Sequence, residues 1–237
     1  MGQAKNWGIG IVSPIKGVIF DLDGTLLDTI DDIAEASNRV YGRRGLAPFS
    51  IAEMKKLVGE GAEELVRKAF AARGAPIPTD DEMAAIIKDY RREYEGCWRL
   101  HSRPYAGVPE LLGGLARRGI RTAVLSNKAQ MFTELMVKDL LPGHHFDIVR
   151  GALPGVPLKP DPAPALAIAA ELGVLPAHCA FVGDTSIDIR TARAAGMFAL
   201  GALWGFRTAE ELISSGAGVL AASPADVLGF LEKRGHP

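Results

Sequence analysis

The chain has 237 residues, of which 48% are hydrophobic, and its formal net charge is −1. That length and apolar content can bury the core of one large domain or two modest ones. A charge so close to zero argues against proteins that bind nucleic acid or an anionic membrane, because these usually carry a basic patch or run. We therefore expect a small solute as the partner.

The two cysteines, Cys97 and Cys179, have neither metal-ligand spacing nor the density of a secreted disulfide scaffold. The most apolar uncharged stretch, residues 194–206, contains three glycines and is too short to cross a bilayer, which takes roughly 20 residues. These features predict a cytoplasmic protein without a membrane partner. We expect a monomer or homodimer, although these features do not decide between the two.

The first strand signal, residues 18–20, ends in two carboxylates, Asp21 and Asp23, followed by Gly24. Side chains alternate along a strand, but at a strand end the chain can turn both carboxylates toward one pocket. Such a pair can bind a hard cation, attack as a nucleophile or transfer protons. An ordinary turn after a strand would use the same residue types, since Asp and Gly are common in turns.

A long helical segment follows. Apolar residues recur at helical spacing over residues 30–41, behind Thr29 as the expected helix cap. Ser50 and Thr79 are each followed three residues later by glutamate, which is capping-box spacing and opens further helices. Since strand signals are missing until after Ser102, we predict a helical insert over residues 30–102 that can act as a lid.

Helix and strand signals alternate from residue 108 onward. Helices are expected at residues 108–118, near 131, and at 163–172, 189–195 and 209–214; strands are expected at 122–125, near 148, at 180–182 and near 198–200, with a final strand and helix. Such alternation predicts an α/β fold, a Rossmann-like parallel sheet with helices on both faces and ligands at the carboxyl ends of its strands. The core would comprise residues 1–29 and 103–237, and residues 30–102 would form an inserted α-helical cap domain.

A second acidic pair follows the strand signal at residues 180–182. Asp188 lies one helical turn beyond Asp184, so a strand-to-helix turn would aim both carboxylates into the same cleft. Two further signals, Ser126-Asn127 and Lys159, also fall where strands are expected to end. Ser126 alone could be a helix cap and Lys159 alone an exposed loop charge, but together they indicate one site.

Four motifs together resemble those of the haloacid-dehalogenase-like hydrolases: FDLDGT at residues 20–25, Ser126-Asn127, Lys159 before a proline, and GDTSID at residues 183–188. The resemblance implies a Mg²⁺-dependent phosphate monoester hydrolase that forms an aspartyl-phosphate on Asp21. Asp23 would protonate the leaving oxygen and contact the metal through its backbone carbonyl. The Asp21 and Asp184 carboxylates would hold Mg²⁺, with Asp188 bound directly or through water.

The same resemblance gives the remaining catalytic residues their roles. Ser126 and Asn127 would bind phosphoryl oxygens, and Lys159 would supply positive charge between Asp21 and the transferring group. Thr25 matches a family position that steadies Asp23. Lys128 could contact substrate charge, but an exposed lysine is the ordinary interpretation of that position.

Two segments resemble the phosphoglycolate phosphatase branch of this family: HSRPYAGV at residues 101–108, and the glycine pair of Val58-Gly59-Glu60-Gly61-Ala62. The branch implies hydrolysis of 2-phosphoglycolate, a small phosphorylated metabolite, to glycolate and phosphate. Gly59, Glu60 and Gly61 would bind the substrate through backbone amides when the lid closes, although a helix break without substrate contact would look the same. Gly151-Ala152-Leu153 departs from the branch, where many relatives have Gly-Gly-Asp.

Three alternative functions can be compared with these residues; one stays open and two are disfavoured. A beta-phosphoglucomutase, or a phosphatase of another small metabolite, would share the core motifs. Haloacid dehalogenases lack the second aspartate of the first motif, so Asp23 argues against dehalogenation. A non-catalytic binding or regulatory protein of this fold would be expected to lose a nucleophile or metal ligand, whereas this chain retains every one.

Overall fold

The computed structural model describes residues 14–234. Its core is a six-stranded, fully parallel sheet in the order β5-β4-β1-β6-β7-β8. The strands are β1 (Gly17–Phe20), β4 (Arg121–Ala129), β5 (Ile148–Ala152), β6 (Cys179–Gly183), β7 (Phe198–Ala202) and β8 (Val219–Ala221). The chain adds β4 and β5 on one side of β1 and then β6, β7 and β8 on the other. The strand order therefore reverses next to β1, and such a reversal creates a ligand crevice at the carboxyl ends of the strands.

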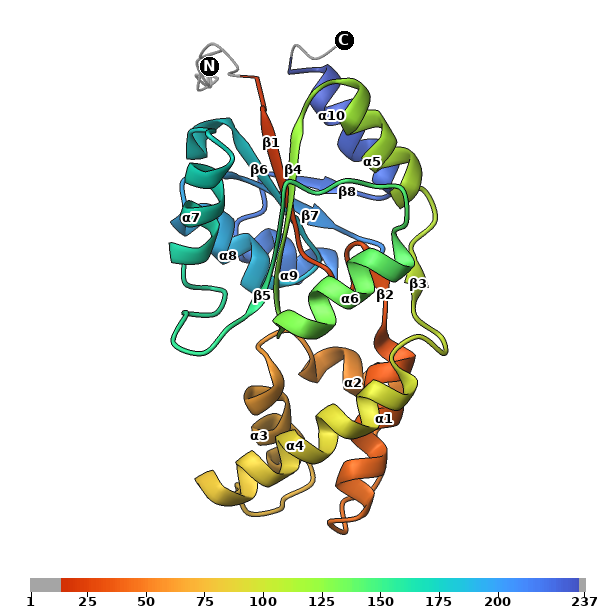
Figure 1. Ribbon diagram of the computed structural model, residues 1–237. Coiled ribbons are helices and arrows are strands. Elements are labelled where there is room, and N and C mark those ends of the chain that lie inside the picture. The colour runs from red at the N-terminus through yellow and green to blue at the C-terminus, as the bar shows by residue number, and fades with distance from the viewer. Residues whose placement is uncertain (1–13, 235–237) are drawn as a thin grey trace, which may run out of the picture.

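Helices cover both faces of this sheet because its central strands are apolar on both faces (Figure 1). Val18 and Phe20 of β1 pack on one face against α5 (Val108–Arg117), α6 (Gln130–Leu140) and α10 (Pro224–Glu232). Ile19 points to the other face, toward α7 (Ala163–Glu171), α8 (Ser186–Ala194) and α9 (Ala209–Ser214). This alternation follows from the two-residue period of a strand.

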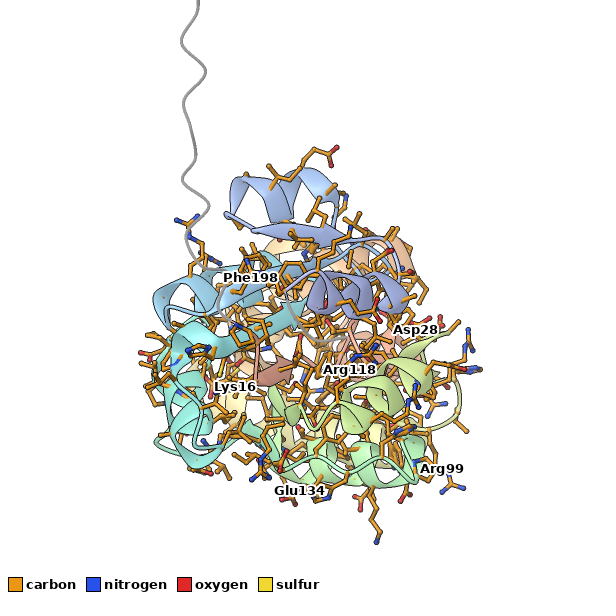
Figure 2. The ribbon with its side chains drawn as sticks, turned by 90° about the horizontal axis from the view of Figure 1, so that it is seen from above. Lys16, Asp28, Arg99, Arg118, Glu134 and Phe198 are labelled. Carbon is orange, nitrogen blue, oxygen red and sulfur yellow. The ribbon has the colours of Figure 1, made fainter. Side chains whose placement is uncertain are left out.

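Figure 2 views the molecule from above, with side chains filling the space between the sheet and its helices. Lys16 and Phe198, labelled there, lie at the amino ends of β1 and β7. Phe198 stacks on Phe230 of α10, with ring centroids 4.6 Å apart. The amino ends of the strands are thus used for packing, and the opposite ends are left for the site.

The helical insert comprises α1 (Ile30–Gly42), α2 (Ile51–Leu57), α3 (Ala62–Ala72) and α4 (Asp80–Cys97) and lies beyond the carboxyl ends of the sheet (Figure 1). Both connections to the core pass through a short antiparallel pair that the sequence did not predict, β2 (Leu27–Asp28) and β3 (Arg103–Pro104). At the return connection, the buried Asp32 carboxylate accepts the backbone N–H groups of His101 and Ser102. These bonds tie α1 to the segment that re-enters the core.

The predicted fold class, an α/β parallel sheet with an inserted helical cap, is confirmed. The capping boxes at Ser50 and Thr79 form as expected and begin α2 and α4. The domain limits at 29/30 and 102/103 stay a prediction, and residues 1–13 and 235–237 of the predicted core lie outside the described residues. Between residues 14 and 234, none of the helices combines the length and apolar character needed to span a membrane.

Candidate active site

Strand register brings the predicted motifs to one edge of the sheet. Phe20 of β1 pairs with Val124 of β4 and Val182 of β6. The residues that follow these three positions therefore emerge side by side, and the Asp21 amide donates to the Val182 carbonyl at 2.9 Å. Parallel strands with this register explain how motifs 160 residues apart in sequence form one site.

Asp21 is held by one of its two carboxylate oxygens. Oδ1 accepts the backbone N–H of Leu22 at 2.7 Å and lies 2.8 Å from the Lys159 ammonium. The residue is 7% exposed and lines the cavity described below. A carboxylate fixed through Oδ1 presents Oδ2 in a defined direction, which is what a nucleophile requires.

Asp184 is held by the loop that follows β1 and by the segment that follows β7. Its Oδ1 accepts the Thr25 hydroxyl at 3.0 Å, and its Oδ2 accepts the backbone N–H of Phe206 at 2.7 Å. A Cβ atom at Gly24 would lie 2.4 Å from Asp184 Oδ2, and one at Gly205 would lie 2.3 Å from Asp184 Cβ. The two glycines therefore let backbone approach this carboxylate closely.

Asp188 completes a cluster of three buried carboxylates. Its Oδ2 accepts the amide and hydroxyl of Thr185, at 3.0 and 2.7 Å, at the start of α8, and its Oδ1 lies 2.7 Å from Lys159 Nζ. Oxygens of Asp21, Asp184 and Asp188 all lie within 4.8 Å of one another. Hard, closely spaced oxygens suit Mg²⁺, so this donor set fits the predicted metal. The Asp23 side chain is not among these oxygens, and its predicted metal contact is through the backbone carbonyl.

The electrostatics of the cluster also fit a cation, because Lys159 pairs with Asp21 and Asp188, whereas within residues 14–234 no lysine pairs with Asp184. Burial, and next the charge of Asp188, raise the pKa of Asp21 well above its ordinary value. The same two causes raise the pKa of Asp184 to about 7. Burial alone would lower the pKa of Lys159, but the charges of Asp188 and Asp21 outweigh it and raise that pKa. The site therefore carries more negative charge than its own lysine balances.

Asn127 positions Lys159 by clamping its backbone. The Asn127 amide oxygen accepts Lys159 N–H at 2.9 Å, and its Nδ2 donates to the Lys159 carbonyl at 2.9 Å and to the Gly59 carbonyl at 3.0 Å. Ser126 is 3% exposed and its hydroxyl accepts the Lys128 amide at 3.2 Å. The predicted contacts of Ser126 and Asn127 with phosphoryl oxygens stay predictions.

Three expectations around Asp23 are corrected. Thr25 was expected to steady Asp23, but its hydroxyl donates to Asp184. Thr29 precedes α1 as expected, yet its hydroxyl donates to Asp23 Oδ1 at 2.7 Å instead of capping the helix. A hydroxyl that donates to a charged acceptor makes the stronger kind of hydrogen bond, which favours an orientation of Thr29 toward Asp23. Lys128 is not an exposed lysine: its side chain is 8% exposed and lies 3.0 Å from both Asp23 oxygens.

A cavity of about 630 Å³ lies between these strand ends and the insert. Asp21, Asp23 and residues 126–128 line its core side, and residues 58–65 line its insert side. Aromatic and apolar side chains make much of the remaining wall, among them Ile33, Ile87, Tyr90, Tyr94, Phe132, Leu153 and Leu158. The predicted core and insert residues thus meet across one space.

The glycine loop of the insert touches the core directly. Gly59 and Gly61 have φ angles of +131° and +89°, which side-chain-bearing residues rarely adopt. Arg207, which the sequence did not single out, donates from Nη2 to the Val58 carbonyl at 2.7 Å. Glu60 is paired with Lys68 at 2.8 Å. The loop is therefore fastened to the core through its backbone.

Other supporting contacts also escaped the sequence. Trp204 donates from its indole nitrogen to the Thr25 carbonyl at 2.9 Å, which braces the loop after Asp21. Its motif, Trp-Gly-Phe, was visible, but the partner of the indole and the backbone donor of Phe206 have no signature in residue types. Gly205, between them, was the one signal of a close backbone approach.

Known proteins share this arrangement. The family model of haloacid dehalogenase-like hydrolases matches residues 18–202. The chain belongs to the haloacid dehalogenase-like hydrolases. Within that family it is 37% identical over 227 residues to a phosphoglycolate phosphatase of Rhodospirillum rubrum, covering 93% of each chain. It is 32% identical over 196 residues to one of Xylella fastidiosa, covering 83% of each. The crystal structure of a predicted phosphoglycolate phosphatase from Haemophilus somnus matches with TM-score 0.83 and 27% identity, covering 94% of this chain and 99% of that one.

These similarities confirm the predicted family and the enzyme class, a phosphatase within the haloacid dehalogenase-like hydrolases. They extend over the insert as well as the core, because each relative is matched over most of its length. The roles of the individual site residues stay predictions, and they enter the proposal that follows.

Proposed function

We propose that this phosphatase is Mg²⁺-dependent, works through an aspartyl-phosphate at Asp21, and has 2-phosphoglycolate as its preferred substrate. The observation that carries the mechanism is the setting of Asp21. Lys159 and the Leu22 amide hold its Oδ1, and the residue lines the cavity. Oδ2 is then the attacking oxygen, and Lys159 offsets negative charge on the phosphoryl group that is transferred to Asp21.

The carboxylates of Asp21, Asp184 and Asp188, with the Asp23 carbonyl, would hold Mg²⁺, which when bound neutralises negative charge on the phosphoryl group. The residues of the chain perform the other tasks. Thr25 and the Phe206 amide fix Asp184, while the Ser126 hydroxyl and the Asn127 backbone N–H would bind the phosphoryl oxygens, because Asn127 Nδ2 already donates to the Lys159 and Gly59 carbonyls. Fixed donors of this kind need no reorganisation as charge develops.

Asp23 is the proposed proton donor to the leaving oxygen and afterwards the base that activates water. Its side chain is 12% exposed and lines the cavity. Thr29, just before α1, and Lys128, on β4, hold its carboxylate. A proton carrier must reach its partner within hydrogen-bond distance, so a fixed carboxylate at the cavity wall suits this task.

The substrate part of the proposal is supported by similarity to phosphoglycolate phosphatases and by the loop at Gly59, Glu60 and Gly61. This loop lines the cavity, its two glycines adopt positive φ angles, and the carbonyls of Val58 and Gly59 are bonded to the core. Backbone amides suit a ligand as small as a two-carbon acid, because they act at short range.

A second candidate is a phosphatase of a larger metabolite, such as a sugar phosphate. It is favoured by the cavity volume of about 630 Å³ and by the wall of Tyr90, Tyr94 and Phe132. Cavities of about 300–1,000 Å³ commonly hold ligands larger than a two-carbon acid. The proposed cytoplasmic location and monomeric or homodimeric state are separate expectations that neither candidate changes.

Phosphate release from a panel of esters tests the proposal. With Mg²⁺, 2-phosphoglycolate should give a higher kcat/KM than hexose phosphates and an aryl phosphate. Chelation should abolish turnover, and Ca²⁺ should inhibit, since calcium takes more ligands at longer distances. Mass spectrometry of acid-quenched enzyme should place a phosphoryl group on Asp21. Full activity in chelator would refute the metal site, and a better hexose phosphate would favour the second candidate.

A further inference from the structure

Lys128 is a cation at the cavity wall whose one task in the chemistry proposed above is to hold the Asp23 carboxylate. It lies on β4, directly after Ser126 and Asn127, and its side chain is 8% exposed. Lysine is rarely buried unless its charge is paired. Burial has a cost that an exposed ion pair avoids. Asp23 supplies that pairing, and the poorly hydrated ammonium stands at the cavity wall, where a ligand can also reach it.

Two groups surround this ammonium. Nζ lies 3.0 Å from both Oδ1 and Oδ2 of Asp23, and it sits over the Tyr94 ring, 4.6 Å from the centroid. An ammonium has three N–H donors, and it can shift among neighbouring acceptors on its flexible stem. Lys128, Asp23 and Tyr94 all line the cavity. An anionic group in the cavity can thus share Lys128 with Asp23.

Lys128 differs from the other charged residues of the cavity wall in its position. The insert contributes Glu60, Glu63 and Glu64, and among the cavity-lining residues the other cations are Arg67 and Arg91. Arg91 is exposed, so water and salt screen it more than they screen Lys128, whose side chain is 8% exposed. Among the cavity-lining cations, Lys128 is the one that contacts Asp23.

We propose that Lys128 is the specificity-determining residue that binds the carboxylate of the substrate, and that the enzyme selects phosphate esters of 2-hydroxy acids. The inference rests on the proposed function, in which Asp23 contacts the leaving oxygen. In such an ester a single carbon separates that oxygen from the carboxylate. A group that touches both Asp23 oxygens is then within reach of the carboxylate, and Tyr94 holds it there by a cation–π contact.

The test is a comparison of two substrates that differ in the carboxylate alone: 2-phosphoglycolate and 2-hydroxyethyl phosphate. Both are assayed by phosphate release in wild type, Lys128→Met and Lys128→Arg. Lys128→Met should lower kcat/KM for phosphoglycolate about tenfold to a hundredfold more than for hydroxyethyl phosphate, since an unpaired buried carboxylate loses a charged hydrogen bond. The excess loss should appear in KM. Lys128→Arg should restore part of it.

Lys138→Met is the matched control, because it removes an exposed lysine of α6 by the same substitution. Thermal melts establish that each variant is folded, and Lys128→Gln replaces Lys128→Met if the latter is not. Equal losses on both substrates would overturn the inference and leave Lys128 as a support for Asp23. A wild type that hydrolyses hydroxyethyl phosphate at least as well as phosphoglycolate would overturn the proposed substrate instead.

Discussion

The strand ends of the core and the glycine loop of the insert face each other across one cavity, but they use different chemical groups. On the core side, Lys159 and Asp188 are charged side chains with 1% and 0% exposure. On the insert side, the fastening contacts are the backbone carbonyls of Val58 and Gly59. Charged side chains act on the reacting atoms, whereas backbone contacts fix the position of the surface that faces the substrate. The core should therefore govern the rate of chemistry on every substrate, and the insert, together with Lys128 of β4, should govern the choice among substrates.

The largest expected effect is at the core nucleophile. Asp21→Asn should reduce kcat by about 10⁴-fold or more on every phosphate ester, because an amide is a far poorer nucleophile than a carboxylate. Phosphate release measures the loss. The melting temperature should not fall, since the change removes one of three crowded negative charges. Asp139→Asn, on the exposed surface of α6, makes the same substitution away from the site. Substantial turnover by Asp21→Asn would exclude the covalent mechanism.

The next effect concerns the close approach of Gly24 to Asp184. Gly24→Ala should lower kcat about 100-fold, because the new methyl group must displace Asp184, and small displacements in a site have effects of that size. Gly74→Ala is the matched control: it also places alanine at positive φ, +66° against +87°, but its Cβ meets nothing within 4 Å.

Both glycine variants should lose about 1–2 kcal/mol of unfolding free energy from backbone strain, as measured by urea denaturation. Only Gly24→Ala should lose activity. Similar activity in the two variants would show that Asp184 tolerates movement, and would weaken its place in the metal site.

A smaller, selective effect is expected in the insert. A Cβ at Gly61 would lie 3.1 Å from Leu158 Cδ1, and φ there is +89°. Gly61→Val should therefore hinder the loop from seating on the core, and kcat/KM for 2-phosphoglycolate should fall about tenfold more than for an aryl phosphate. Gly45→Val is the control, with φ +79° and an open environment within the insert. Equal losses on both substrates would place selectivity elsewhere.

The smallest effect is thermodynamic and concerns the charge of the core. In metal-free protein the pKa of Asp184 is raised from 3.8 to about 7. Between these values the folded state binds more protons than the unfolded state, so stability falls as pH rises through this window. A bound cation favours the ionised carboxylate. The increase in melting temperature caused by Mg²⁺ should consequently be larger at pH 8 than at pH 5. An increase that is the same at both pH values would contradict the raised pKa of Asp184.

The sequence predicted most strands and motifs of the core, because an apolar run that ends in Asp or Ser indicates both a buried strand and a polar group at its carboxyl end. It was less informative about which partner each polar side chain chooses. Thr25 and Thr29 are both threonines near Asp23, and only the path of the loop decides that Thr25 reaches Asp184 and Thr29 reaches Asp23. The burial of Lys128 depends on Tyr94, 34 positions earlier in the chain, and a local pattern cannot show it.

The Asn127 side chain makes one hydrogen bond to the insert, at Gly59, and two within the core, at Lys159. Any outward movement of the insert must break its bond to Gly59, together with the bond from Arg207 to Val58. The bond to Gly59 has a net value of about 1 kcal/mol and the bond from the charged Arg207 about 1.5–3 kcal/mol, so these two contacts oppose such a movement only modestly. The two bonds from Asn127 to the Lys159 backbone lie wholly within the core. The Lys159 ammonium would therefore keep its position in the core if the insert moved outward.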